Sequence, residues 1–465
     1  MIRSAIGGLS SKETHTRRHS RHFKEIAANR YSETGPLGNI LIIAYHFPPQ
    51  AGSSGLLRSL KYCRYLPEFG WHPAVLTPHP RAFEKIDEKS LHFIPQGVPV
   101  IPSFAMDTKK HMGIGGRYLR YMALPDRWVS WVFGGVPTGL RAVREHKTDV
   151  LYSTFPILSA AVIGLWLQRF TGLPWVLDLR DPITQDDYPH DPLIRRVWSK
   201  VERACMRRVS RVIFTAEATR RMYLERYPEF LKPEMCFLIS NGYDEADFCD
   251  LELPAIGPVP AGRRIRLVHS GLIYPVERDP RPMFNAVGRL KKMGRLSPDK
   301  VQIVFRAPGS EDLYRKLLAE RDIEDLITLE PHIPYRQALQ ECAEADGLLL
   351  FQAADCDKQI PAKAYEYLRI GKPILALATH TGDTAALLRE VGGATVVNIA
   401  SEDEIYEGLS SFVDALRVGT HPVPNKNKIQ RYTREAQAGQ LARVLDELTD
   451  KTHHDEKVRI EKVAK

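Results

Sequence analysis

The segment Ile40-Leu-Ile-Ile-Ala44, with the loop Phe47-Pro-Pro-Gln-Ala-Gly-Ser-Ser-Gly55 that follows it, decides the fold class of this chain of 465 residues. Its first five residues are all apolar, as expected for a strand buried on both faces of a sheet. Proline, glycine and serine then mark a loop. A helical pattern of leucines follows and ends at Gly70, and Ala74–Thr77 is the next strand. A strand, a helix and a strand in this order predict a parallel sheet.

The same alternation continues in two series. Further strands of the first series are expected at Val150–Thr154, Trp175–Asp178, Val212–Thr215 and Cys236–Ser240, with helices at Leu158–Phe170, Leu193–Val209 and Ala218–Tyr227. Strands of the second series are expected at Ile265–His269, Val301–Arg306, Ile327–Glu330, Gly347–Gln352, Pro373–Leu377 and Thr395–Val397. Residues 80–145 are less regular. The pattern predicts an α/β protein with two Rossmann-like halves and a main site in the cleft between them.

Changes in composition give the expected domain limits. Residues 1–37 are basic and expected to lack order, and Leu251–Gly262 is rich in proline and glycine, which marks a linker. The expected parts are a basic segment 1–37, an N-terminal domain 38–250, a linker 251–264, a C-terminal domain 265–425, a helix 426–449 that can cross back to the N-terminal domain, and a charged tail 450–465.

Charge and cysteine content limit the classes of partner. The net charge is +9, which fits nucleic acid, an anionic membrane surface or phosphorylated substrates, but also a basic surface that is merely solvated. Nucleic acid is disfavoured because neither zinc-finger spacing nor an aromatic-glycine RNA-binding signature is present. The six cysteines lie far apart without a CxxC pair, which favours a reducing compartment and neither a zinc site nor a disulfide framework. No apolar run approaches the roughly 20 residues of a membrane-spanning helix.

Several motifs in order along the chain resemble family 4 glycosyltransferases, in the subgroup with Phe-Pro-Pro and Pro-x-Lys-x-x-Glu-Tyr motifs. They are Tyr45–Arg58, Tyr65–Thr77, Asp178–Pro182, Asn241–Phe248, Ser270–Tyr274 with Arg278, and Ile360–Pro373. The resemblance implies the GT-B fold, in which two Rossmann-like domains face each other across a cleft. It also implies a nucleotide-sugar donor held by the second domain, an acceptor held by the first, retention of anomeric configuration, no cofactor and no obligatory metal.

The loop before the first helix is a candidate donor site. Gly52 and Gly55 allow close approach of the backbone to a ligand, and a helix expected to begin near Ser53 would present free N–H groups to a diphosphate. The alternative is a turn that only connects strand and helix. Arg58 is either a phosphate or acceptor contact or a surface arginine. His46 either contacts acceptor or sugar in a catalytic role or makes a local hydrogen bond.

Further candidates follow strands of both halves. Asp178 and Arg180 are acceptor-side candidates, and Asp181 is the favoured catalytic carboxylate; the alternative is an internal Arg–Asp pair that closes a turn. In the second half, the resemblance puts Gly271 and Arg278 against the diphosphate, where arginine would offset the charge of the leaving group. Arg281 competes with Arg278, and either could be a surface charge.

Glu366 matches the second glutamate of the family's motif of two glutamates separated by seven residues, which implies that it holds the donor's ribose. Lys358 stands where the first glutamate is expected, and Asp357 is a candidate substitute. Lys363 lies one helical turn before Glu366 and could pair with it or reach the phosphates.

A turn near the end of the second half is the last donor-binding candidate. Thr381-Gly-Asp-Thr384 resembles a donor-binding turn, with Thr384 as the binding residue; a helix N-cap is the alternative. Asp355-Cys-Asp357 looks like a metal-binding motif of another glycosyltransferase fold, and no metal is expected.

The expected activity is transfer of a sugar from a nucleotide-sugar donor to a glycan or lipid-linked acceptor in polysaccharide or glycolipid assembly. The alternatives are a sugar-nucleotide epimerase of the same architecture and an inactive nucleotide-sugar binding protein. Residues 111–143 interleave arginine with tryptophan and leucine, which fits either a membrane interface or an ordinary packed helix. A cytoplasmic protein, with peripheral attachment to the inner face of the membrane as an option, is therefore expected.

Overall fold

The computed structural model describes residues 38–51, 55–113, 117–186, 188–276, 278–352 and 356–463, with side chains as far as residue 449. The basic segment 1–37, Gly52, Ser53 and Asp355 lie outside the described residues. By its contacts the chain divides into two compact units. The first unit is drawn from Met1–Leu177, His190–Ser210 and Ala438–Lys465, and the second from Asp178–Pro189 and Arg211–Gln437. The domain limits drawn from composition stay a prediction.

The first series of strands forms a parallel sheet in the order β3-β2-β1-β4-β5-β6-β7. Its strands are β1 Gly38–Ile43, β2 Trp71–Pro78, β3 Val100–Ser103, β4 Val150–Thr154, β5 Trp175–Leu179, β6 Arg211–Phe214 and β7 Cys236–Leu238. In the register, Ile42 of β1 lies opposite Val75 on one side and Tyr152 on the other. All three side chains are fully buried, so β1 is covered on both faces as its apolar run predicts.

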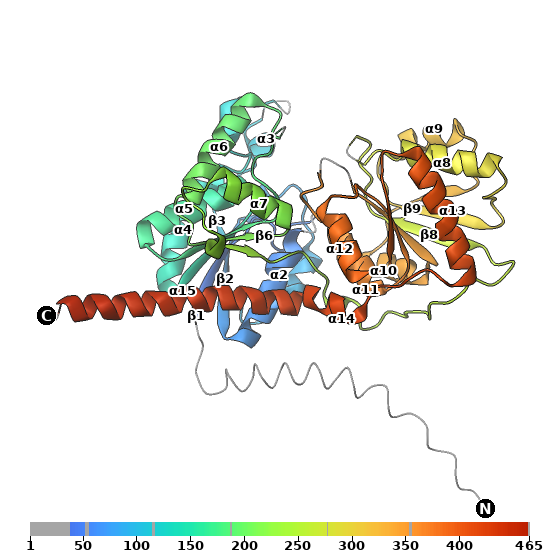
Figure 1. The fold of residues 1–465 in the computed structure, drawn as a ribbon. Helices are drawn as coiled ribbons and strands as arrows, with labels where there is room; N and C mark the ends of the chain where they lie inside the picture. The colour runs from blue at the N-terminus through green and yellow to red at the C-terminus, as the bar shows by residue number, and fades with distance from the viewer. Residues whose placement is uncertain are drawn as a thin grey trace, which may run out of the picture. The chain divides into compact units, whose positions relative to one another are not determined.

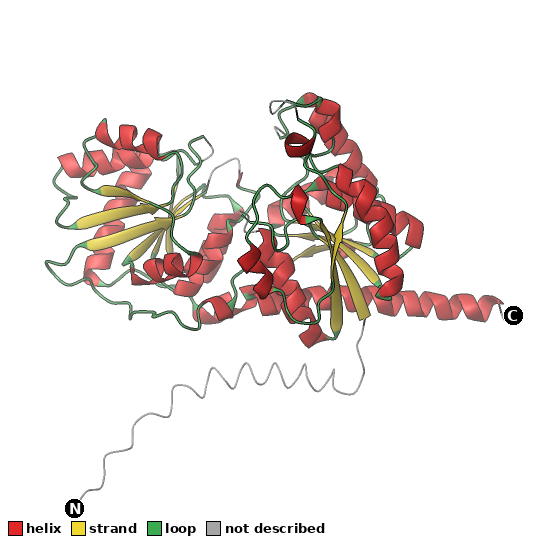
Figure 2. Cartoon of the chain, turned by 180° about the vertical axis from the view of Figure 1, so that it is seen from behind, coloured by secondary structure: helices red, strands yellow, loops and turns green. Residues whose placement is uncertain are grey.

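Helices connect these strands (Figures 1 and 2). They are α2 Gly55–Tyr65, α3 Thr108–His111, α4 Ser130–Glu145, α5 Leu158–Thr171, α6 Pro192–Met206 and α7 Glu217–Arg226, and the C-terminal α15 spans Arg434–Val463. The described part of α2 begins at Gly55, and the helix ends at Tyr65, because Pro67 opens a separate 3₁₀ turn that Gly70 terminates with a φ of 81°. The 3₁₀ turn shortens the helix relative to the sequence pattern.

Strand β3 and helix α4 lie inside residues 80–145, where the sequence pattern predicted neither. Strand β3 adds an edge to the sheet, and α4 contains three glycines and Pro137, which weaken a helical pattern. Those glycines permit close packing: a Cβ at Gly135 would lie 2.6 Å from Ile163, and one at Gly139 would lie 2.7 Å from Leu167, both on α5. The helix is therefore specified by its tertiary partners rather than by propensity.

The second series forms a parallel sheet in the order β10-β9-β8-β11-β12-β13. Its strands are β8 Ile265–Ser270, β9 Val301–Arg306, β10 Ile327–Glu330, β11 Gly347–Phe351, β12 Ile374–Leu377 and β13 Ala394–Val397. Its helices are α8 Arg281–Lys292, α9 Glu311–Ala319, α10 Tyr335–Glu344, α11 Ala362–Ile370, α12 Asp383–Val391, α13 Glu402–Val418 and α14 Lys426–Ile429. Helices α8, α9 and α13 cover one face, and α10, α11 and α12 cover the other (Figure 1).

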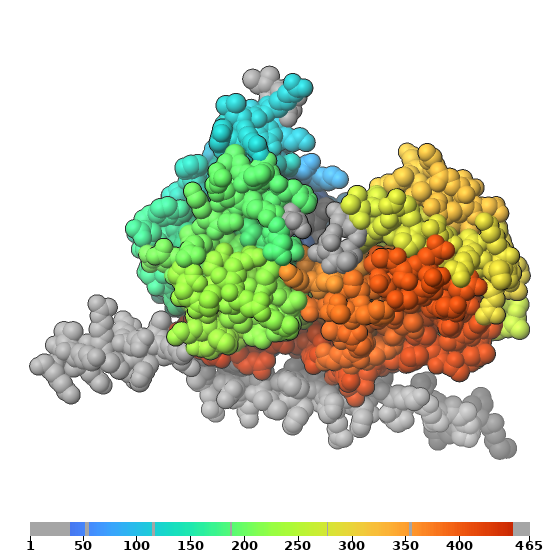
Figure 3. Space-filling model, turned by 45° about the horizontal axis from the view of Figure 1, so that its top comes forward, coloured from blue at the N-terminus to red at the C-terminus, as the bar shows by residue number. Residues whose placement is uncertain are grey.

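The two faces of this second sheet give two buried apolar clusters, one under each helix layer. Figure 3 shows the surface of this second unit, where two ion pairs link α13 to its neighbours: Arg289 of α8 pairs with Asp403 at 2.6 Å, and Arg295 pairs with Asp414 at 3.1 Å. The strand order reverses between β8 and β11. Ligands of open parallel sheets bind beyond the carboxyl ends of strands at such a reversal, so this is where the site is sought.

Candidate functional site

Gly271 lies at the carboxyl end of β8 and adopts a conformation that other residues rarely take. Its φ is 103°, and its N–H donates to the carbonyl of Arg306 at 2.8 Å. A Cβ there would lie 3.0 Å from Nζ of Lys363. The absent side chain therefore leaves room for a ligand beside the ammonium group.

Lys363 lies in the first turn of α11 and contacts a buried histidine. Its Nζ is 3.3 Å from Nε2 of His269, and Nδ1 of that ring is 2.8 Å from the carbonyl of Leu349. Nδ1 must therefore donate, and Nε2 accepts from the ammonium. Burial and the charge of Lys363 hold the pKa of His269 well below its usual value, so the ring is neutral. Burial and the neighbouring Arg278 lower the pKa of Lys363 to about 7.

Arg278 points into the same region, whereas Arg281 does not. Nη2 of Arg278 donates to Oε1 of Gln352 at 3.3 Å, and its guanidinium lies 5.3 Å from the centre of the Tyr274 ring. The Nε of Arg278 is buried and has no hydrogen-bond partner within the described residues. Arg281 is more than half exposed and is ion-paired with Asp279 at 2.7 Å. The geometry thus separates these two competing arginines.

Gln352 ties Arg278 to the loop that precedes α11. Its Nε2 donates to the carbonyls of Cys356 at 2.8 Å and Gln359 at 3.1 Å. The same Gln359 carbonyl accepts from the hydroxyl of Thr384 at 3.2 Å, and Thr384 is almost fully buried. Thr384 therefore joins this network through a structural hydrogen bond, and the N-cap of α12 is Gly382, one residue before Asp383.

Glu366 lies one turn after Lys363 on α11. Its Oε1 accepts from the hydroxyl of Tyr335 at 2.7 Å, and burial raises the pKa of its carboxyl. The sequence offered two options for Lys363, an ion pair with Glu366 or contact with the phosphates. Among the described interactions Glu366 has no ion pair with Lys363. The structure thus brings Gly271, Arg278, Lys363 and Glu366 to one edge of the second sheet.

Lys358, which stands in place of the first glutamate, contacts residues of helix α7. Nζ of Lys358 lies 3.8 Å from Sδ of Met222, and its carbonyl accepts from the hydroxyl of Thr219 at 2.7 Å. The carboxylate of Asp357 accepts a hydrogen bond from the hydroxyl of Thr379. Asp357 therefore already has a partner, and its role as a substitute stays a prediction.

His46, Gly55 and Arg58 belong to the first unit. Nδ1 of His46 is 3.3 Å from Oε1 of Gln50, which is the local hydrogen bond considered as an alternative. Gly55 begins α2. Arg58 is only 2% exposed and stacks over Tyr62 at 5.3 Å, so the surface-arginine interpretation is wrong.

Asp178, Arg180 and Asp181 follow one another through the end of β5. Asp178 is fully buried in the strand, and the carbonyl of Arg180 accepts from the hydroxyl of Thr215 at 2.8 Å. Burial raises the pKa of the Asp181 carboxyl, and the Asp178 charge adds to this, while Arg180 opposes it. The carboxyl of Asp181 thus has a raised affinity for protons.

The sequence argument did not select Tyr45, His269, Tyr335 and Gln352. Tyr45 packs against Trp128 with ring centres 4.5 Å apart, and burial raises its pKa. His269 and Gln352 are polar residues at the ends of apolar strands, a pattern visible in the sequence. Tyr335 reaches Glu366 from another helix, for which no local signal exists. Among the described residues, no group of three His, Cys, Asp or Glu side chains could hold a metal ion.

The second unit has a doubly wound parallel sheet with cationic side chains beyond its central strands, and the first sheet has the same parallel type. These are the two Rossmann-like domains of the GT-B glycosyltransferase fold. Residues 57–242 match the family model of the glycosyl transferase 4-like domain. No curated protein sequence matches the chain.

Solved structures similar to the chain share little sequence with it. Sucrose-phosphate synthase from Thermosynechococcus elongatus is 14% identical, with a TM-score of 0.58 over 89% of this chain and 99% of that one. HepE from Anabaena in complex with UDP-glucose is 13% identical, with a TM-score of 0.54 over 90% and 100%. WaaG, a glycosyltransferase involved in lipopolysaccharide biosynthesis, is 14% identical, with a TM-score of 0.54 over 87% and 99%. The comparisons thus show a glycosyl transferase 4-like domain at residues 57–242 and the GT-B fold for the chain.

Proposed function

We propose that the protein transfers a sugar from a nucleoside-diphosphate donor to a glycan or lipid-linked acceptor, with retention of anomeric configuration and without a metal or cofactor. One observation carries the proposal. Lys363 lies beside Gly271, Arg278 lies close enough to lower the pKa of Lys363, and neither has an ion pair with a carboxylate among the described interactions. Two partly buried cations that lack an ion pair within the described residues favour a ligand with closely spaced negative charges.

A diphosphate fits this requirement. Gly271 lets phosphate oxygens approach the backbone, and the buried Nε of Arg278 is left to donate to them. Arginine stays charged at every physiological pH, so it can stabilise the charge that grows on the departing diphosphate. Glu366, with Tyr335 holding its carboxylate, is proposed to accept hydrogen bonds from the ribose hydroxyls.

The proposed reaction balances within the two substrates. The bond between the anomeric carbon and the phosphate oxygen breaks, and the acceptor oxygen forms the new bond on the same face. The acceptor proton passes to an oxygen of the leaving diphosphate. Asp181 and His46 are proposed catalytic groups, and Asp178, Arg180 and Arg58 are proposed to bind the acceptor. The residues proposed to add donor contacts are Gly52, Ser53, Gly55 and Thr384.

Turnover of matched arginine variants tests the proposal. The full chain is assayed with UDP-glucose, the ligand of the HepE structure, and with other nucleotide sugars, against lipid and glycan acceptors. Arg278→Gln is expected to lower kcat on the order of 100-fold, since it removes a donor to the developing anion. Arg281→Gln removes an exposed arginine three residues away and is expected to keep turnover. Unchanged kcat in folded Arg278→Gln would overturn the proposed role.

The same assay separates the alternative activities. An epimerase would convert the donor in the absence of any acceptor and yield an epimeric nucleotide sugar. An inactive binding protein would show a thermal shift with the donor but no product with any acceptor. The NMR coupling of the anomeric proton in the product reports whether configuration is retained.

A lipid-linked acceptor is proposed because the first unit exposes large apolar side chains near arginines. Leu119, Tyr121 and Phe133 are 72%, 75% and 76% exposed, and Arg117 is exposed as well. Trp131 of α4, by contrast, is fully buried, so α4 itself packs in the domain. Within the described residues no helix combines the length and the apolarity that crossing a bilayer requires.

We propose peripheral attachment to an anionic membrane on the cytoplasmic side, which flotation with liposomes tests. Wild-type protein should float with vesicles that contain 30% anionic lipid, on the order of the anionic content used for such assays. The triple variant Leu119→Ser, Tyr121→Ser, Phe133→Ser should remain at the bottom of the gradient. A variant of an exposed apolar residue in the second unit, Val276→Ser, serves as the control. Wild-type protein that stays with the unbound fraction would contradict attachment.

A further inference from the structure

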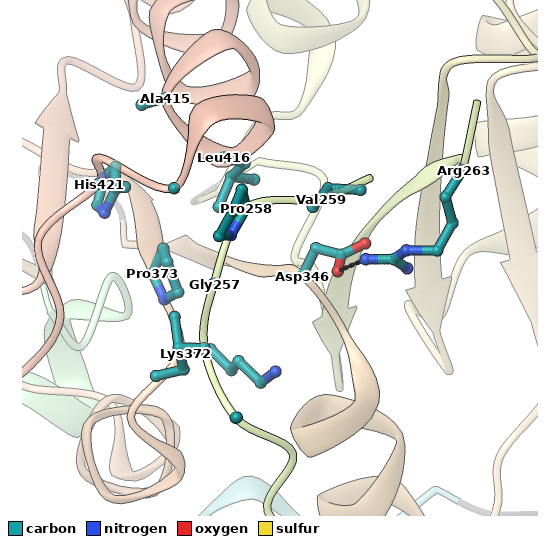
Figure 4. A pocket seen from close by; sticks show the side chains of 13 residues that line it. Gly257, Pro258, Val259, Arg263, Asp346, Lys372, Pro373, Ala415, Leu416 and His421 are labelled. Carbon is teal, nitrogen blue, oxygen red and sulfur yellow. Dashed lines mark hydrogen bonds and ion pairs between the residues drawn. The ribbon is translucent and has the colours of Figure 1, made fainter. Parts of the chain in front are cut away.

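A cavity of about 140 Å³ lies in the second unit at the opposite edge of the sheet from the proposed donor site (Figure 4). Arg263, Asp346 and Lys372 line it, and each lies one or two residues before the start of a strand: β8, β11 and β12 respectively. Because these strands are parallel, their amino ends meet at this edge, while Gly271 lies at the other end of β8. The cavity is thus separate from the site described above.

Lys372 brings a buried charge to this cavity. The residue is 6% exposed, and it has neither a hydrogen bond nor an ion pair among the described residues. Figure 4 shows its side chain extending past the backbone at Gly257 toward the side on which Asp346 and Arg263 lie. Burial lowers the pKa of its ammonium group, with Arg263 adding to this effect and Asp346 opposing it. Because this ammonium has no ion pair within the described residues, an anion that enters the cavity would supply its counter-charge.

The other polar groups of the cavity are already satisfied. The carboxylate of Asp346 accepts from Nη2 of Arg263 at 2.5 Å and from the N–H of Arg266 at 2.9 Å. Nδ1 of His421 donates to the carbonyl of Pro422 at 2.8 Å, and Nε2 is 3.0 Å from the hydroxyl of Thr395. Burial also lowers the pKa of His421, which favours its neutral form. Within the described lining, the charge that lacks a counterpart is that of Lys372.

The remaining walls are apolar and fixed. Val259 donates its N–H to the carbonyl of Leu416 at 3.2 Å, which holds this part of the linker against the end of α13. A Cβ at Gly419 would lie 2.7 Å from the backbone of Pro258, so the chain fits closely there. The volume is about ten times the roughly 10–15 Å³ that one water needs, yet below the about 300 Å³ of typical organic-ligand pockets. A nucleotide sugar is too large for it.

We propose that this cavity is a second ligand site, which binds a small anion through Lys372. The ligand class is a phosphate or carboxylate group with at most a short apolar part, which the walls at Val259 and Leu416 would contact. A charge-assisted hydrogen bond from the Lys372 ammonium is the main source of affinity. The site is independent of the proposed sugar transfer, because no donor or acceptor takes part in it.

Calorimetric titration tests the site in the Lys363→Met variant, which lacks the lysine proposed to bind phosphate at the donor site. Inorganic phosphate, methylphosphonate and acetate are titrated into the full-length Lys363→Met variant at pH 7.5 in a chloride-free buffer. The added substitution Lys372→Met should weaken binding of the preferred anion roughly tenfold to hundredfold, the equivalent of one hydrogen bond to a charged group. Lys292→Met removes an exposed lysine of the same unit and should leave binding unchanged.

A second variant keeps the charge and fills the cavity. Ala415→Met adds bulk beside Leu416, and it should also abolish binding while Lys372 remains. Unfolding by heat without ligand reports whether each variant folds. Equal affinity with and without Lys372, binding that survives Ala415→Met, or the absence of any anion binding in the Lys363→Met background would each overturn the proposal.

Discussion

Raising the pH above 7 should weaken the binding of UDP through a single group, Lys363. Its pKa is lowered to about 7 by burial and by Arg278, so the ligand-free protein loses this charge as the pH rises through 7. A bound diphosphate favours the ammonium form and raises that pKa. Binding above pH 7 must therefore take up a proton, and the affinity falls with pH.

The size of the effect follows from that pKa. At pH 8.5 the neutral form exceeds the charged form about 30-fold, which corresponds to about 2 kcal/mol. Half of the groups are already neutral at pH 7, so the affinity for UDP should drop by about 15-fold between pH 7 and pH 8.5. His269, the ring against Lys363, is neutral throughout this range because its pKa lies well below its ordinary value.

Isothermal titration calorimetry with UDP at pH 7.0, 7.5, 8.0 and 8.5 measures this slope directly. Repeating the titration in buffers of different ionisation enthalpy counts the protons taken up. Lys363→Met should bind UDP more weakly at pH 7 and with a flat pH profile. The control Lys316→Met removes an exposed lysine of α9 and should keep the wild-type slope.

Two outcomes would refute the reasoning. A wild-type affinity that is constant between pH 7 and pH 8.5 would mean that the ammonium of Lys363 does not face the diphosphate. The same slope in Lys363→Met would assign the proton to another group. The unfolding free energy supplies an independent check: the unfolded chain holds this proton up to about pH 10.5, so Lys363 should make the fold more stable as the pH rises from 7 toward that value.

Two further substitutions test the second unit. Gly271→Ala forces a side chain into a φ of 103° and toward Nζ of Lys363, so it should cost about 1–3 kcal/mol of stability and weaken UDP binding, as thermal unfolding and calorimetry would measure. Glu341→Gln leaves Arg306 and Arg266 without the carboxylate they contact at 2.7 and 2.6 Å, and should lower the urea midpoint by an amount equivalent to about 3 kcal/mol. These arginines hold the Glu341 pKa below its usual 4.5 against the effect of burial, so this contribution is present above pH 4.5 and is lost as the pH falls further. A pH-independent midpoint difference between wild type and Glu341→Gln down to pH 3 would contradict this account.

Local patterns were sufficient for most elements of both sheets. The apolar runs at β1, β8 and β11 lie in the central strands, and each is covered on both faces. Burial on both faces requires mostly apolar side chains, which makes these strands recognisable in the sequence. The helices between them were visible because their apolar faces repeat with the helical period. The end of α2 and the 3₁₀ turn at Pro67 depend on local backbone geometry. Gly70, which ends the turn with a positive φ, is the sequence signal for it.

The elements that the pattern missed depend on distant partners. The three glycines and Pro137 of α4 read as helix breakers, but the helix forms because they bring its backbone against α5 and against Phe104. Likewise, the sequence favours Arg278 but leaves Arg281 as a competitor. The fold distinguishes them because Asp279 pairs with the second, while Gln352, 74 residues away from Arg278, contacts the first.

The sequence by itself determined the α/β class, the two series of parallel strands and the motifs that mark the edges where ligands bind, because periodicity and strand-end residues are local properties. The tertiary structure alone decided the environment of each charged group. Lys363 and Lys372 are both lysines near a helix or strand terminus, and nothing in their neighbours along the chain predicts a lowered pKa. Residues remote in sequence bury them, and the cost of desolvating an ammonium group depends on that burial and on which charges the fold brings within reach.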